Sequence, residues 1–383
     1  YAYKGGNQKV KEKREELSDA VYINSGNKKK KKTKKVFAKQ GSGVAKSTDL
    51  NQDGSPDIFV AGSVIPGSYP YHFPNKLLLN DGSGNLIIDQ DNSETVNEVM
   101  GIVKDALWID LNFDGLEDLI LVGEWMPITV FLNQKGELKK QSNYFSTKKT
   151  QNGWWNTIEV GDFNNDGHVD LIIGNEGTNN AFNSSLNHPV QIHFDDFDQN
   201  GSVDPILSYY IQGKSYPLAT RDEILGQWVA LKSTYPSYES YAKTDLESLL
   251  KDHITENTKI WKATEMRSML LMSQKDGYKI QYLPDEVQRS PLKSIVISDL
   301  NLDGNQDLIL AGNRTENALK IGRNEANYGT ILLGDGKGDF KTLPTFESGL
   351  IFKGSVSSML EINNTLYIGR CNEELMIFSR NEN

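Results

Sequence analysis

Short apolar runs separated by polar turns dominate the chain, and each of the clearest runs begins with an aspartate. The runs DLILVG, DLIIGN and DLILAG are almost wholly apolar, as expected of strands covered on both faces. The segments before them, ALWIDL, NTIEVGDF and SIVISDL, alternate or run apolar into an acidic loop. The pattern predicts pairs of β-strands joined by tight acidic loops along most of the chain.

The acidic loop repeats with a fixed order of residue types. The pattern Asp-x-[Asn/Asp]-x-[Asp/Asn]-Gly-x-x-Asp, followed by an apolar run, starts at Asp49, Asp110, Asp162, Asp196 and Asp299. A hairpin signature follows most copies, as in LLLNDGSGNL and ILLGDGKGDF. Two inner strands and an outer hairpin, at roughly 50-residue spacing, describe one blade of a β-propeller.

We therefore predict an all-β fold, a seven-bladed β-propeller of four-stranded antiparallel blades. Five blades carry acidic loops, a last blade lies around SVSSMLEINNTLYIGRCNEELMIFSR, and a partial blade with VYINSGN lies near the N-terminus. A six-bladed propeller is the alternative, if the two terminal pieces join. We expect one domain over residues 1–383, closed by its N- and C-terminal strands, because closure removes open sheet edges.

Between residues 218 and 260 the pattern changes to helical spacing. Capping boxes begin at Thr220 and at Thr244, and apolar residues at helical spacing follow each of them. We predict a helical insertion within one blade at 218–260. It either covers a blade edge or presents a surface to a ligand, since insertions on rigid scaffolds often carry function.

The acidic loops have the chemistry of calcium sites. Calcium prefers six to eight oxygen ligands, and side chains at positions 1, 3, 5 and 9 of a curled loop, with the carbonyl at position 7, can surround one ion. An ordinary Asp-Gly turn is the plainer interpretation of one copy, but five copies in one register favour metal. The EF-hand fails because position 12 is apolar in every copy. The predicted ligands are Asp49, Asn51, Asp53, Ser55, Asp57, Asp110, Asn112, Asp114, Leu116, Asp118, Asp162, Asn164, Asp166, His168, Asp170, Asp196, Asp198, Asn200, Ser202, Asp204, Asp299, Asn301, Asp303, Asn305 and Asp307.

These loops also explain the charge of the chain, which has 41 basic and 51 acidic side chains and a formal charge of -10. Fifteen of the acidic side chains are loop aspartates, so the remaining 36 are fewer than the basic ones. Up to five calcium ions, with magnesium as an alternative in some loops, would bring the total near zero. The acidity is therefore no sign of a partner, and it argues against nucleic-acid binding. The lysine run at 28–35 is expected at a hairpin tip.

At these residues the chain resembles the FG-GAP/VCBS repeat family, whose calcium loops lie in β-propellers such as the heads of integrin α chains. The stretches VIPGSYPYHFPNKLLLNDGSG, GEWMPITVFLN, GWWNTIEVGDFNNDG and DPILSYYIQGKSYPLATRDEIL look like long bacterial VCBS-repeat proteins related to the ASPIC/UnbV and cartilage-acidic-protein group. The resemblance implies an extracytoplasmic bacterial protein that is secreted, periplasmic or anchored at the outer surface. It also implies that this chain is a section of a longer parent protein, and no apolar run in it is long enough for a membrane helix.

The leading functional hypothesis is a calcium-stabilised surface module that binds a protein or a glycan in adhesion. In integrin heads the side opposite the metal loops contacts ligands, so the resemblance makes Tyr69, Tyr71, Arg314 and Arg323 candidate ligand-binding residues. No complete catalytic constellation is visible, and no catalytic residue is assigned. Trp125, Trp154 and Trp155 are expected in the core.

Two alternatives remain open. The chain could be a carbohydrate-active enzyme, a polysaccharide lyase or glycoside hydrolase, that uses the face opposite the metal loops. Its candidate carboxylates would be Asp222 with Glu223 and Glu316 with Glu325, whose separation decides the mechanism. It could also be a scaffold that docks against other domains of the parent protein.

Overall fold

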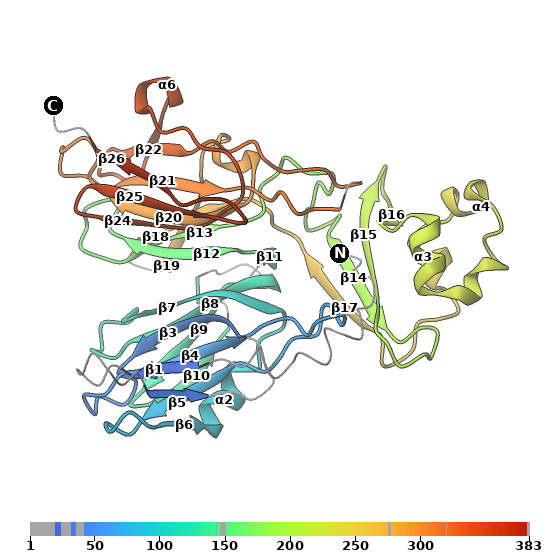
Figure 1. The fold of residues 1–383 in the computed structure, drawn as a ribbon, viewed down its shortest axis with the longest axis horizontal. Coiled ribbons are helices and arrows are strands. Elements are labelled where there is room, and N and C mark those ends of the chain that lie inside the picture. The colour runs from blue at the N-terminus through green and yellow to red at the C-terminus, as the bar shows by residue number, and fades with distance from the viewer. Residues whose placement is uncertain are drawn as a thin grey trace. The chain divides into compact units, whose positions relative to one another are not determined.

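A computed structural model of the protein describes residues 20–23, 32–35, 42–142, 144–145, 151–274, 277–318 and 320–380 (Figure 1). The fold is mostly β, with 43% strand and 11% helix. Two compact units divide the chain. The first comprises Tyr1–Leu121, Thr129–Gln141 and Ser184–Thr264, and the second comprises Val122–Ile128, Ser142–Asn183 and Glu265–Asn383.

The first unit opens with a hairpin and two antiparallel sheets. The hairpin pairs β1 (Ala20–Ile23) with β2 (Lys32–Lys35), and the residues between these strands lie outside the described part of the chain. One sheet contains, in chain order, β3 (Ser42–Thr48), β4 (Asp57–Gly62), β5 (Lys76–Asn80) and β6 (Leu86–Asp89). The next contains β7 (Ile102–Ile109), β8 (Asp118–Met126), β9 (Thr129–Gln134) and β10 (Glu137–Gln141), and α2 (Gln90–Val96) lies between the two sheets in sequence.

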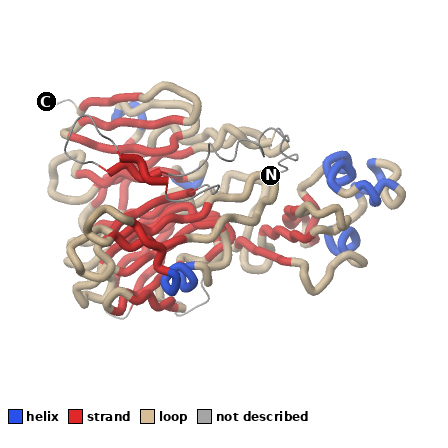
Figure 2. Tube along the Cα trace, turned by 60° about the horizontal axis from the view of Figure 1, so that its bottom comes forward, coloured by secondary structure: helices blue, strands red, loops and turns tan. Residues whose placement is uncertain are grey.

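A third sheet of the first unit has a different strand order. It contains β14 (Val190–Asp195), β15 (Asp204–Ile211), β16 (Lys214–Pro217) and β17 (Lys259–Ala263), in the order β16-β15-β14-β17. Its last strand therefore pairs with its first strand, whereas in a blade the last strand follows the third. The segment between β16 and β17 carries α3 (Arg221–Gln227), η2 (Val229–Lys232), α4 (Tyr238–Ala242) and α5 (Leu246–Leu250), which gather beside this sheet (Figure 2).

The second unit holds three sheets. One contains β12 (Thr157–Gly161), β13 (Asp170–Gly174), β18 (Met269–Gln274) and β19 (Gly277–Tyr282); the next contains β20 (Leu292–Ser298), β21 (Asp307–Gly312), β22 (Thr330–Gly334) and β23 (Phe340–Leu343). A three-stranded sheet contains β24 (Val356–Ile362), β25 (Thr365–Arg370) and β26 (Met376–Ser379). The short elements are β11 (Gly153–Trp154), which pairs with β8, and η3 (Val287–Arg289) and α6 (Thr345–Ser348).

The strand pairing corrects the assignment that sequence order suggests for one hairpin. The hairpin β18–β19 follows the acidic loop at Asp196 in the sequence, but β18 pairs with β13, which begins at Asp170. Residues 184–264, with the whole β14–β17 sheet, are therefore inserted between the second and third strands of the sheet that begins with β12. The expected helices at 218–260 lie inside this larger insertion.

Burial confirms the prediction that the runs after the acidic loops are inner strands. Every residue of β8, β13 and β21 is buried, whereas the outer strand β19 is mostly exposed. Within the second unit, apolar side chains of neighbouring sheets pack against one another, as Ile172 and Leu308 do in one shared cluster. Trp125, Trp154 and Trp155 are buried as expected.

Of the two predicted helix N-caps, one is confirmed and the other lies one residue further along the chain. Thr220 forms the predicted capping box with Glu223 at the start of α3. The prediction of a second box at Thr244 is wrong, because α5 begins after Asp245, whose carboxylate accepts from the N–H of Ser248 (2.9 Å). α4, capped by Ser237, is an additional helix between them.

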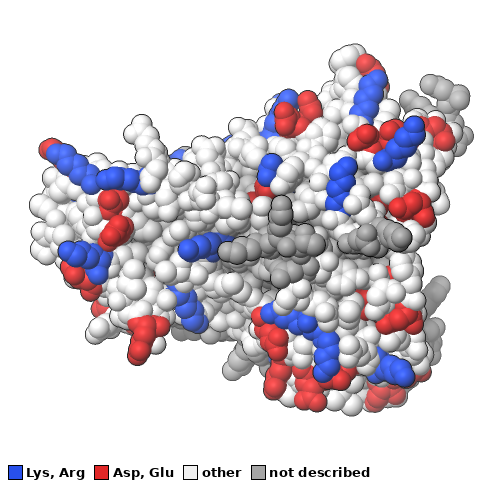
Figure 3. All heavy atoms as spheres, turned by 180° about the vertical axis from the view of Figure 1, so that it is seen from behind, with Lys and Arg blue, Asp and Glu red and all other residues white. Residues whose placement is uncertain are grey.

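The number of blades and the closure of a ring stay predictions. β1–β2 and β24–β26 each form a sheet of their own among the described residues, and those sheets take the antiparallel form expected of blades. No helix of the described chain is long and apolar enough to cross a membrane. On the face shown in Figure 3, acidic and basic side chains are interspersed, so the net charge of -10 is not gathered in one patch there.

Asn175, directly after β13, joins four backbone groups of the second unit through one buried side chain. Its Oδ1 accepts from the backbone N–H groups of Trp154 (3.1 Å) and Glu176 (2.8 Å). Its Nδ2 donates to the carbonyl oxygens of Glu265 (3.0 Å) and Arg267 (3.3 Å). Because the side chain is fully buried, water cannot replace these bonds.

Asn175→Ala should therefore lower the free energy of unfolding by about 2–4 kcal/mol, since it leaves several buried backbone groups without partners. Thermal and urea unfolding followed by circular dichroism measure the change. Asn257→Ala, at an exposed asparagine, is the matched control and should cost less than about 0.5 kcal/mol. Equal stability of the two variants would contradict the bridging role of Asn175.

His193 makes the inserted sheet sensitive to acid. It lies buried in β14, and burial, with a smaller contribution from Lys262, lowers the pKa of its imidazole from 6.5 to about 4. Between pH 6.5 and pH 4, His193 is protonated in the unfolded chain and neutral in the folded chain, so a fall in pH favours unfolding. The stabilisation is fully present above about pH 6.5 and is lost as the pH falls toward 4, by up to ~3 kcal/mol.

His193→Gln should flatten this part of the pH dependence of unfolding. We expect the melting temperature of the wild type to fall more steeply than that of the variant between pH 7 and pH 4.5. His188→Gln, at an exposed histidine, should keep the steeper wild-type dependence. Parallel pH profiles for wild type and His193→Gln would show that His193 is not the responsible group.

Candidate metal centres

The five acidic loops share one backbone conformation. In the first loop, the carboxylate of Asp49 accepts from the N–H groups of Asp53 (3.0 Å) and Gly54 (2.9 Å), so position 1 closes the loop on positions 5 and 6. The same bonds recur at Asp110, Asp162, Asp196 and Asp299. The repeated sequence pattern thus encodes a repeated fold of the loop.

Positive φ angles at two successive corners complete this conformation. The glycine at position 6 lies at φ between 80° and 88° in all five loops. Position 4 is also left-handed, although Gln52, Phe113, Asn165, Gln199 and Leu302 occupy it, with φ between 56° and 61°. Residues other than Gly and Asn disfavour the left-handed backbone region. At most of these positions the folded loop therefore holds a residue in a conformation that it would not adopt by itself.

The aspartate at position 9 has a second role that the sequence does not reveal. In the second loop, Asp118 Oδ2 accepts from the N–H of Leu111 (3.1 Å), and its Oδ1 accepts from the N–H of Asn133 (2.8 Å) in β9. Asp118 is fully buried. One carboxylate therefore ties the start of the loop, the second strand and the third strand together. Asp57, Asp170 and Asp307 make the equivalent pairs of bonds.

The fourth loop differs because β15 has no third strand beside its first residues. β16 pairs only with Ser208–Ile211. Asp204 Oδ2 accepts from the N–H of Phe197 (3.0 Å), and the second backbone hydrogen bond of Asp204 comes from Asp198 in the loop itself instead of from a third strand. Ligand oxygens of Asp196, Asp198 and Asp204 all lie within 4.8 Å of one another. The fourth loop carries Asp198 at position 3, where the other four loops carry asparagine, and among the described residues it brings three acidic side chains together as a metal would require.

Electrostatics of this group fit a cation. Burial and repulsion by the Asp198 and Asp196 carboxylates together raise the pKa of Asp204 to about 6, despite two backbone hydrogen bonds that lower it. Burial also raises the pKa values of Asp57, Asp118 and Asp170, again with repulsion from the acids of their own loops. A divalent cation would remove this repulsion and hold all the carboxylates ionised. The oxygen-only donor set suits a hard cation such as calcium or magnesium.

The candidate ligand-binding residues have varied surroundings. Tyr71 packs edge-on against Phe194, with ring centroids 5.3 Å apart, and Lys259 Nζ lies 5.0 Å from its ring centroid. Arg314 is largely buried in an ion pair with Glu176 (2.9 Å). The exposed Arg323 pairs with Glu325 (2.6 Å). Tyr69 precedes Pro70 in the loop between β4 and β5. A shared ligand face formed by these residues stays a prediction.

The carboxylates named for catalysis already have neighbours as partners. Asp222 accepts from the hydroxyl of Tyr238 (2.6 Å), and Glu223 caps α3. Glu316 accepts from the hydroxyl of Thr315 (2.9 Å) and Glu325 from Arg323. These bonds hold the four side chains against neighbouring residues, and catalysis by them stays a prediction.

Sequence reasoning missed two further features. Asp81 and Asp335 stand at the tips of outer hairpins, where each accepts from the N–H groups two and four residues ahead and so shapes the turn. The Asp-Gly pairs in the sequences NDGSG and GDGKG could have indicated these aspartate-stabilised turns. A groove lined by tyrosines beside β16 was also missed, because strand pairing and a helix from a later segment build it.

Comparison with known proteins gives a local family match. Residues 110–173, which include the second and third acidic loops, match the FG-GAP-like repeat model. No curated protein matches the chain. Among solved structures, the crystal structure of the V. cholerae biofilm matrix protein Bap1 is similar at 12% identity, covering 94% of this chain and 73% of that chain, with a TM-score of 0.28. At that TM-score the likeness carries no argument about function.

The two roles of the loop aspartates can be separated by mutation in chelator, where metal contributes nothing. Asp118→Ala removes a buried acceptor of two backbone N–H groups and should cost about 2–4 kcal/mol of unfolding free energy even without metal. Asp114→Ala, at an exposed position of the same loop, should cost less than about 1 kcal/mol in chelator. Urea unfolding in chelator measures both variants, and an equal loss would contradict the structural role of position 9.

Proposed function

We propose that the protein is a calcium-stabilised binding module of the bacterial cell exterior that attaches to a protein or a glycan. The observation that carries the proposal is the set of five equivalent acidic loops, of which the fourth brings three carboxylates within 4.8 Å. The match of residues 110–173 to an FG-GAP-like repeat supports it, because such repeats commonly bind calcium. The proposed ligands are the 25 loop residues given above, with up to five ions and magnesium as an alternative.

A structural role for the ions follows from where the loops lie. Each loop joins the first two strands of a sheet, and its last ligand is the first residue of a buried strand. An ion there neutralises acids that otherwise repel one another at the strand ends. The loops supply many protein oxygens, which suits a closed structural site better than an open catalytic one.

Binding is favoured over catalysis by the surroundings of the remaining acids. In the described part of the chain, each of the four carboxylates suggested for a carbohydrate-active enzyme is hydrogen-bonded by a residue close to it in the fold. We therefore place the function in recognition, with an extracellular location in which millimolar calcium fills weak sites. The partner would be a surface protein or glycan, or another domain of a longer parent protein.

Chelation should lower the melting temperature of the intact chain by several degrees, and added calcium should restore it. A ligand that binds only the folded state stabilises it by about 2.7 kcal/mol per site at 100 times its dissociation constant. Differential scanning calorimetry in calcium, in magnesium and in chelator, with metal analysis of the dialysed protein, measures the effect. Unchanged melting together with no bound metal would contradict the proposal.

The fourth loop offers an internal control. Asp198→Ala should reduce the calcium bound per chain by about one ion, whereas Asp252→Ala, an exposed acid outside the loops, should leave it unchanged. The binding function itself is tested with arrays of bacterial glycans and surface proteins, probed with the calcium-loaded chain. Binding that disappears in chelator supports the proposal, and no binding to either array in calcium would refute it.

A further inference from the structure

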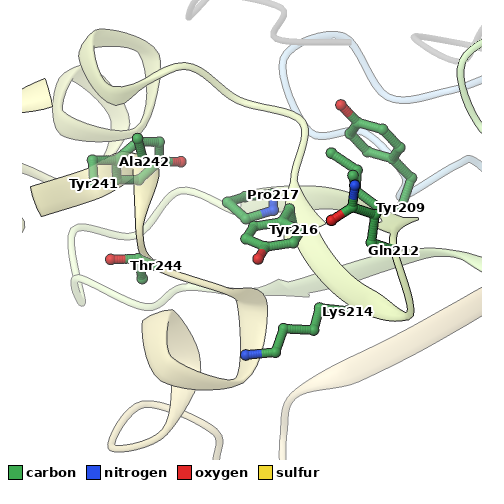
Figure 4. Close-up of a pocket in the computed structure, with 9 residues that line it drawn as sticks. Tyr209, Gln212, Lys214, Tyr216, Pro217, Tyr241, Ala242 and Thr244 are labelled. Carbon is green, nitrogen blue, oxygen red and sulfur yellow. The ribbon is translucent and has the colours of Figure 1, made fainter. Parts of the chain in front are cut away.

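A groove lies on the inserted sheet, between the β15–β16 hairpin and the segment around α4 (Figure 4). Its volume is about 490 Å³. The residues that line it are Tyr209, Ile211, Gln212, Lys214, Tyr216, Pro217, Tyr241, Ala242 and Thr244. None of them belongs to the acidic loops or to the ligand face considered above.

Strand register builds one wall of the groove. Tyr209 pairs with Tyr216 and Ile211 with Lys214, so these four side chains share one face of the hairpin. β14 pairs with β15 only as far as Ser208, so this part of the hairpin projects beyond the strand. Along this part of the hairpin Ile211, Gln212 and Lys214 are exposed, and Tyr209 and Tyr216 are half-buried.

The opposite wall is held rigid by hydrogen bonds. The hydroxyl of Tyr241 donates to the carbonyl of Ala219 (2.8 Å), and the hydroxyl of Thr244 donates to the carbonyl of Ser240 (2.9 Å). Below this wall, the insertion has its own buried core, which includes Leu225, Trp228 and Leu249. A cluster of this size fixes the position of α4 against the sheet.

Two polar groups at the groove are free to take a ligand. Within the described residues, the side-chain amide of Gln212 and the hydroxyl of Tyr216 have no hydrogen-bond partner. Gln212 occupies the first corner of a two-residue turn at φ 49°, where Asn or Gly is strongly preferred. The amide of Gln212 therefore lies beside the groove although the backbone conformation at this position is unfavourable for glutamine. Lys214 adds an exposed ammonium, 3.9 Å from Asp245.

We infer that this groove binds a sugar ring of a glycan. The C–H-rich face of a pyranose packs on phenol rings, while its hydroxyls exchange hydrogen bonds with amide, hydroxyl and ammonium groups. The volume suits about one or two sugar rings. An apolar peptide anchor would need a deep dry pocket, whereas this lining alternates aromatic and polar groups. The inference rests on the proposed binding function and names its ligand class and its site.

Calcium acts on this site only at a distance. The fourth acidic loop ends at Asp204, the first residue of β15, and the groove begins five residues later at Tyr209. Five residues of strand span roughly 17 Å, so an ion in the loop cannot touch the sugar. It instead fixes the strand that carries Tyr209 and Ile211.

Isothermal titration of the calcium-loaded full chain with chitohexaose, cellohexaose and tetragalacturonate tests the inference. These probes separate acetamido, neutral and acidic sugars, and we expect at least one to bind with a dissociation constant below about 1 mM. Tyr216→Ala should weaken that binding at least ~10-fold through loss of the stacking surface. Gln212→Gly should weaken it about 3- to 10-fold while relieving the left-handed turn, so its loss cannot come from unfolding.

Tyr210→Ala is the matched control, because Tyr210 lies on the same strand but faces His188 on the other side of the hairpin. It should bind as the wild type does. Binding that survives both groove substitutions would refute the groove and leave the binding function intact. No binding to any of the three probes would refute the glycan assignment, and a surface protein found on the arrays would then be the ligand. If the chain also bound nothing on the glycan and surface-protein arrays, the proposed function itself would be refuted.

Discussion

The buried aspartate that ends each acidic loop is the constraint on which the sheets depend. In four loops its carboxylate accepts one N–H from the start of the loop and one from the third strand, so that three segments meet at one side chain. A buried charge is costly unless it is hydrogen-bonded or paired, and these bonds offset part of that cost. A cation bound by the same loop would offset more, which links metal binding to the stability of the strands.

In the fourth loop, the aspartate at position 9 lacks, within the described residues, the hydrogen bond from a third strand. Its sheet has the order β16-β15-β14-β17, so no third strand reaches the first residues of β15. Asp204 is still buried and accepts its backbone hydrogen bonds from within the loop, and its pKa is raised by burial and by the neighbouring acids. At its far end β15 extends beyond its pairing with β14 and pairs with β16 alone, and the tyrosine groove lies there. A single strand thus begins at the last residue of an acidic loop and carries part of the tyrosine groove at its other end.

Much of the fold could be predicted because its signals are local. The apolar runs after Asp118, Asp170 and Asp307 became fully buried strands, and the capping box at Thr220 formed as expected. The cap at Asp245 was misplaced by one residue because Thr and Asp compete for the same position. The hairpin β18–β19 could not be assigned to its sheet, since nothing in its residues distinguishes a strand that is next in sequence from one that lies across the insertion of residues 184–264.

The sequence by itself determined the acidic loops, the strand types and the helical character of the insertion. These depend on residue spacing over a few positions, which φ preferences, side-chain alternation and oxygen chemistry control directly. Only the tertiary structure decided that residues 184–264 interrupt a sheet, that Asp118 and its equivalents tie the loop start to two strands, and that Tyr216 and Tyr241 line one groove. Such contacts join segments distant in sequence, and the free energy that selects them comes from packing and backbone pairing, which no short pattern records.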